Sequence, residues 1–108
     1  MEEEILHLYQ EPAIGASYTN TYGEENIRNL LNKYHSLDNE GRQQMMKMVV
    51  NFSQSTDLAT SFVSVGVLHA LGQNEGVAEA YSWANTQEDA ERIINHFEIG
   101  KSVADYFF

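Results

Sequence analysis

The sequence predicts an all-α fold, a single compact domain of about five to seven short helices that spans residues 1–108. Three observations support this prediction. Four segments repeat apolar residues at the spacing of one helix face, residues that start or stop helices lie at their boundaries, and 43% of the chain is hydrophobic. We expect residues 1–22 to form a short helix and a loop, and residues 23–108 to form the helical core.

The N-terminal region is predicted to begin with a short helix over residues 2–9. Pro12, Gly15 and the polar run 17–21 then indicate a loop, because these residue types favour turns over regular structure. Gly23 is followed by two glutamates, and acidic side chains favour the positive end of a helix dipole. A helix is therefore expected to start directly after Gly23.

Four stripes of apolar residues at i, i+3, i+4 and i+7 predict the next helices. These stripes are Ile27-Leu30-Leu31-Tyr34, Met45-Met48-Val49-Phe52, Val77-Ala80-Tyr81-Ala84 and Ala90-Ile93-Ile94-Phe97. Helix pairs then recur about every thirty residues (24–54, 57–84, 87–108), which by analogy suggests a HEAT-like array of helical hairpins. No side-chain pattern repeats at that period, so the array is an analogy only.

Several polar residues and one glycine mark the predicted helix ends. Ser36 and Asp38 are candidate caps of the second striped helix, and Thr86–Asp89 has the spacing of a capping box before the last one. Gly100 is expected to end that last full helix. A further short helix through Val103 and Phe107 is expected to bury the terminal aromatic residues.

The segment Leu58–Leu71 is apolar around much of its circumference, as in a central buried helix, and Thr56 or Asp57 is its candidate cap. Its valines also alternate with Ser64 and Gly66, which is typical of a half-buried strand. An α+β fold with a strand near Phe62–Leu68 is therefore the alternative. We favour the helix because no partner strand with turn residues lies nearby.

The net charge of −10, from 16 acids and 6 bases, lies mainly at the two ends of the chain. Residues 1–25 carry six acids and no base, and residues 75–108 carry seven acids and two bases. Such a surface repels nucleic acid and anionic lipid. Without cysteine, an export signal or a membrane span, the chain is expected to be cytoplasmic and to hold no cofactor.

No recognised catalytic or metal motif includes the four histidines. His96 is expected to cap a helix C-terminus, and His69 to lie in the core with one backbone partner. The acidic pairs lie at helix starts or on polar faces, where carboxylates are solvated. The chain is therefore predicted not to be an enzyme, although a small hydrolase with a histidine and a carboxylate is an alternative.

Acidity combined with aromatic residues instead favours binding to a basic protein. The concrete prediction is a bacterial immunity protein or antitoxin that neutralises a nuclease-type toxin by binding it. The predicted contact residues are Glu75, Glu79, Tyr81, Trp83, Glu88, Asp89 and Glu91. Duplex mimicry is disfavoured because the middle of the chain is neutral, and a homo-oligomeric adaptor with contacts through the Met and terminal Phe residues is a further alternative.

Overall fold

The computed structural model describes all 108 residues and contains six α-helices and no strand. The helices are α1 (Glu2–Gln10), α2 (Glu24–Ser36), α3 (Asn39–Ser53), α4 (Leu58–Ala70), α5 (Asn74–Ala84) and α6 (Ala90–Phe107), with a 3₁₀ turn, η1 (Tyr18–Asn20), between α1 and α2. The all-α prediction is confirmed. The α+β alternative is wrong, because the segment Phe62–Leu68 lies inside α4.

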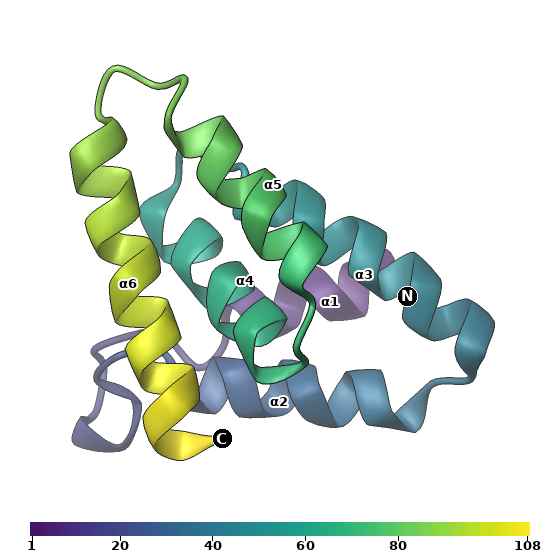
Figure 1. The fold of residues 1–108 in the computed structure, drawn as a ribbon. Coiled ribbons are helices and arrows are strands. Elements are labelled where there is room, and N and C mark those ends of the chain that lie inside the picture. The colour runs from purple at the N-terminus through teal and green to yellow at the C-terminus, as the bar shows by residue number, and fades with distance from the viewer.

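Helix α4 is the centre of the packing. Its residues from Ser61 to Leu68 are all buried, and it contacts α2, α3, α5 and α6. Figure 1 shows α4 between α6 and α5, with α2 beneath. A helix satisfies its own backbone hydrogen bonds in such a buried place, whereas a lone strand would leave them unpaired. The surrounding helices thus decide the structure of a segment whose valines favour a strand.

The contact between α4 and α6 brings the two backbones close together. A Cβ atom on Gly100 would lie 2.5 Å from the carbonyl oxygen of Phe62, and one on Gly66 would lie 3.3 Å from the carbonyl oxygen of Gly100. Gly100 does not end the last helix, as the sequence predicts, because α6 continues without a break to Phe107. This glycine permits close helix packing and has no left-handed backbone conformation.

The apolar core has two parts that share α4. The larger part joins α1, α2, α3, α4 and the end of α6, and the smaller part joins α4, α5 and α6. All four predicted stripes contribute buried residues, for example Ile27 from α2, Met45 from α3, Ala80 from α5 and Phe97 from α6. None of the six helices has the length and apolar content needed to span a bilayer.

The helix ends agree with the sequence in some places and differ in others. Gly23 has a φ of 76° at the start of α2, and the Asp38 carboxylate accepts a hydrogen bond of 2.8 Å from the Gly41 amide at the start of α3. The predicted capping box before α6 is wrong. The Thr86 hydroxyl donates instead to the carbonyl of Trp83 at the end of α5, at 2.7 Å.

Helix α1 is tied to the core through Tyr9. The Tyr9 ring packs edge-on against Phe52 with 5.1 Å between ring centroids, and its hydroxyl hydrogen-bonds with the Ser64 hydroxyl at 2.6 Å. Burial raises the pKa of the Tyr9 phenol well above its ordinary value, so the group is neutral and suited to the interior. The N-terminal acids are therefore carried on a helix with a fixed position.

Candidate functional site

The acidic residues predicted to bind a partner lie in two groups, one on α5 and one at the corner that follows it. Glu75 and Glu79 lie on α5 and line a groove against α3. Glu88, Asp89 and Glu91 lie at the α5–α6 corner (residues 85–91). All five side chains are exposed, and none takes part in an ion pair. The structure thus exposes the predicted acids but does not gather them into one cluster.

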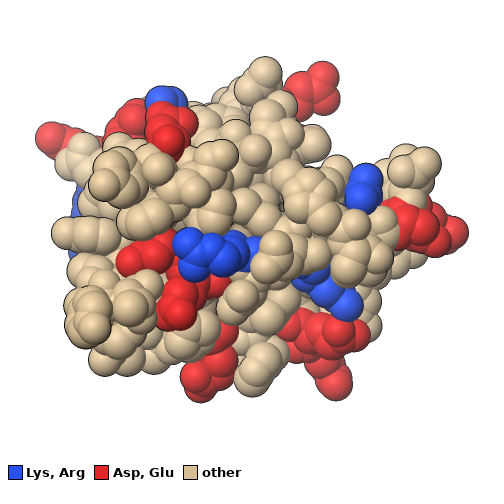
Figure 2. All heavy atoms as spheres, turned by 90° about the horizontal axis from the view of Figure 1, so that it is seen from below, with Lys and Arg blue, Asp and Glu red and all other residues tan.

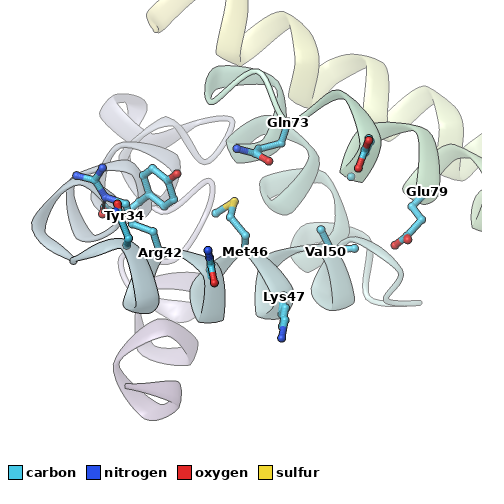
Figure 3. A pocket seen from close by; sticks show the side chains of 11 residues that line it. Tyr34, Arg42, Met46, Lys47, Val50, Gln73 and Glu79 are labelled. Carbon is cyan, nitrogen blue, oxygen red and sulfur yellow. Dashed lines mark hydrogen bonds between the residues drawn. The ribbon is translucent and has the colours of Figure 1, made fainter.

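The groove between α3 and α5 has a volume of about 780 Å³. Its α5 wall carries Glu75 and Glu79, its α3 wall carries Arg42 and Lys47, and Met46 contributes to its apolar lining. Figure 3 shows Arg42 beside Tyr34 at one end, Glu79 at the other, and Met46 pointing toward Gln73 between them.

Arg42 does not neutralise the acidic wall of this groove. Its Nε atom donates to the Tyr34 carbonyl at 3.1 Å, and its Nη2 atom donates to the His35 carbonyl at 3.0 Å. The guanidinium also lies 5.1 Å from the centre of the Tyr34 ring. It therefore satisfies backbone groups at the end of α2, where free carbonyls and the helix dipole favour a cation.

The α5–α6 corner has only shallow hollows, of about 450 and 400 Å³, which Glu88 and Asp89 line together with Arg92. His96 lies beside them and hydrogen-bonds through Nδ1 to the Arg92 carbonyl at 2.9 Å. The expectation that His96 lies at a helix C-terminus is wrong, because α6 continues past it to residue 107. The corner is an open acidic surface with no enclosed cavity.

Tyr81 and Trp83 are half-buried on α5 and pack against the core formed with α6. The Tyr81 ring contacts Phe97 edge-on, with 5.3 Å between ring centroids, and its hydroxyl donates to Glu98 at 3.2 Å. Burial, together with the charge of Glu98 and this hydrogen bond, raises the pKa of Tyr81 to about 12. Only part of each side chain is left to contact a partner.

The tyrosines that the sequence predictions missed are far more accessible. Tyr18 is 92% exposed and Tyr22 is 55% exposed in the loop between α1 and α2, and Tyr106 is 83% exposed near the end of α6. In the sequence, the exposure of Tyr18 and Tyr22 is indicated by their place in a predicted polar loop, outside every apolar stripe. Phe107 and Phe108 are also partly exposed, and the Arg28 guanidinium lies 5.4 Å from the Phe108 ring centre.

The histidines form no site with carboxylates. The Nε2 atom of His69 is buried without a hydrogen-bond partner, and burial, followed by the charge of Lys101, lowers the pKa of His69. No histidine lies in ion-pair contact with an acid, and no group of three or more His, Asp or Glu residues is placed to hold a metal ion. Of the clustered methionines, Met45 is buried, and Met46 and Met48 are half-buried against the core.

Most of the negative charge has no positive partner. The only two ion pairs join Lys33 to Glu4 at 2.8 Å and Lys101 to Asp105 at 2.7 Å, which leaves fourteen of the sixteen acids without one. Figure 2 shows acids in several separate groups on one face, with basic residues among them. Comparisons with protein-family models, curated proteins and solved structures find no significant match.

Proposed function

We propose that this chain is a small acidic protein-binding domain that neutralises a basic toxin of the nuclease type by binding it, as a bacterial immunity protein or antitoxin does. The observation that carries the proposal is the set of fourteen acids without ion-pair partners, five of them exposed on α5 and at the α5–α6 corner. Unpaired carboxylates attract a basic protein over distance and speed its association.

The two groups of acids imply an extended contact. Glu75 and Glu88 are separated by the length of α5, whose 11 residues span roughly 16 Å at 1.5 Å per residue. A basic surface at least this long is needed to contact Glu75 and Glu88 at once. The binding groove of a nuclease carries such a surface, because it holds a phosphate backbone with regularly spaced charges. The exposed parts of Tyr81 and Trp83 would add apolar contact between the two groups.

The test begins with capture of the partner from cells that express the chain, followed by growth assays. The captured protein is expected to be basic, to stop growth when expressed alone, and to become harmless when the chain is co-expressed. A neutral or acidic partner, or growth that the chain does not restore, would overturn the proposal.

Matched charge variants then locate the contact on the chain. The variant E75Q/E88Q/E91Q is expected to weaken binding of the toxin at least tenfold, or about 1.4 kcal/mol. The control E2Q/E3Q/E40Q makes the same charge change on α1 and α3 and is expected to change affinity by less than about twofold. Equal losses in both variants would show that net charge alone drives binding, without a contact at α5.

A further inference from the structure

We infer that the α1–α2 loop (residues 13–22) is a second protein-contact surface, on which Tyr18 and Tyr22 bind arginine side chains of a basic partner. The inference rests on the proposed function only in that the partner is basic. It places a contact on the opposite half of the sequence from the acids of α5.

The base of the α1–α2 loop is fixed by two buried asparagines. The Nδ2 atom of Asn20 donates to the Asn26 Oδ1 atom at 2.9 Å, and the Asn20 Oδ1 atom accepts from the Glu25 amide at 2.9 Å. Asn26 in turn donates to the carbonyls of Leu8 and Pro12, at 3.1 and 2.9 Å. These bonds connect the end of α1, the loop and the start of α2, so the loop is held in one conformation before any partner arrives.

The two tyrosine rings of this loop have no aromatic partner and no side-chain hydrogen bond within the molecule. Neither ring packs against another aromatic ring, and neither phenol group makes a hydrogen bond within the chain. Tyr106 is also exposed, but its ring packs edge-on against Phe107 with 4.8 Å between centroids. Tyrosines on a preorganised loop are typical anchors of protein interfaces, because a large surface is buried at low entropic cost.

The charge around the loop selects the chemistry of the partner. Glu11 precedes the loop and Glu24 and Glu25 follow it, and no lysine or arginine lies among residues 1–25. Glu2, Glu3 and Glu4 lie in the first turn of α1, at the end of that helix away from the loop. The buried carboxylate of Glu24 accepts a hydrogen bond of 2.8 Å from the Tyr22 amide, so it also holds the loop. A guanidinium group stacks on a tyrosine face and is attracted by nearby carboxylates, which makes arginine the side chain that suits both features.

The test uses the full chain and two defined probes, a short arginine-rich peptide and a lysine-rich peptide of equal length and charge. The arginine-rich peptide is expected to shift the backbone amide NMR signals of residues 16–22. The variant Y18A/Y22A is expected to reduce the affinity measured from those shifts at least fivefold, whereas the control Y106A leaves it unchanged. Both tyrosines are exposed, so an unchanged urea midpoint is expected to confirm that the double variant folds.

Three results would overturn the inference. These are unmoved signals for residues 16–22, equal affinity of Y18A/Y22A and the unmodified chain, and equal effects of the two peptides on the loop. The peptide measurement needs no toxin, so its failure leaves the proposed function standing. Conversely, a captured partner without toxic activity would overturn the proposed function and leave the peptide result intact.

Discussion

At the scale of single residues, burial decides which aromatic side chains are available for binding. Tyr81 and Trp83 lie at predicted helical positions, but their burial depends on α6, which returns to pack beside α5. A sequence pattern does not contain that contact. Tyr18 is different, because its polar neighbours and its place in a loop are local properties that already indicate exposure.

His69 is a residue whose environment gives a measurable pH dependence. It lies near the end of α4, and the charged groups that influence it are Lys101, Asp105 and Glu98 on α6. Burial lowers its pKa from the ordinary value of 6.5, so the folded chain binds this proton less readily than the unfolded chain does.

We therefore expect stability to fall as the pH drops from above 6.5 through the lowered pKa of His69. In this range the unfolded state takes up the proton first, and the free energy of unfolding decreases. Urea unfolding between about pH 7.5 and pH 5 is expected to show a steeper loss for the unmodified chain than for His69→Gln. The control His7→Gln, on an exposed position of α1, should keep the steep loss; identical slopes for all three chains would contradict the prediction.

At the scale of helices, the sequence predicts starts that depend on local bonds and fails where tertiary packing decides. Helix α2 begins directly after Gly23 and the Asp38 side chain caps α3, as the sequence predicts. Both residues act within the first turn of the helix that follows them. The sequence predicts that Gly100 ends a helix, but this glycine lies inside α6 and permits the close approach of α6 to α4. The segment Leu58–Ala70 is helical because other helices surround it. Its valines alone are also compatible with a strand, so the local sequence does not decide between the two structures.

The two aspartates that precede helices allow a matched test of capping. The Asp38 carboxylate accepts a hydrogen bond from the Gly41 backbone amide, whereas the Asp57 carboxylate accepts only from the Thr60 hydroxyl, at 2.6 Å. Asp38→Ala is expected to lower the free energy of unfolding by about 1 kcal/mol, because a backbone donor loses its partner. Asp57→Ala is expected to lower the free energy of unfolding by clearly less, as measured by urea unfolding. An equal or larger cost for Asp57→Ala would show that helix-dipole charge, not the cap bond, dominates.

At the scale of the whole molecule, the sequence predicts how much charge is present but not where it gathers. The acidic ends are visible in the sequence, and so is the neutral middle. That Glu75 and Glu79 line a groove against α3, apart from the acids of the α5–α6 corner, follows only from the packing of α5 against α3 and α6. The candidate surface could therefore be predicted as a set of residues, but not as an arrangement.

The excess of unpaired acids also predicts the response of stability to salt. The carboxylates repel one another more in the folded chain, so screening is expected to raise the urea midpoint between about 0.01 M and 0.15 M NaCl. Over this range the Debye length falls from about 30 Å to about 8 Å. The variant E75Q/E88Q/E91Q should show a smaller rise. A midpoint that falls with salt would show that attractive ion pairs dominate.

The central position of α4 also has a consequence for the synthesis of the chain. Helix α6, which contacts α4 most extensively, is made after α4, so α4 leaves the ribosome before the helix that covers most of it exists. Until residues 90–107 emerge, a stretch of valines, leucine and phenylalanine that is buried in the finished protein faces water or another protein. A nascent chain that pauses at this point exposes the type of apolar segment that chaperones recognise. Once α6 is complete, it packs on α4 and covers this segment.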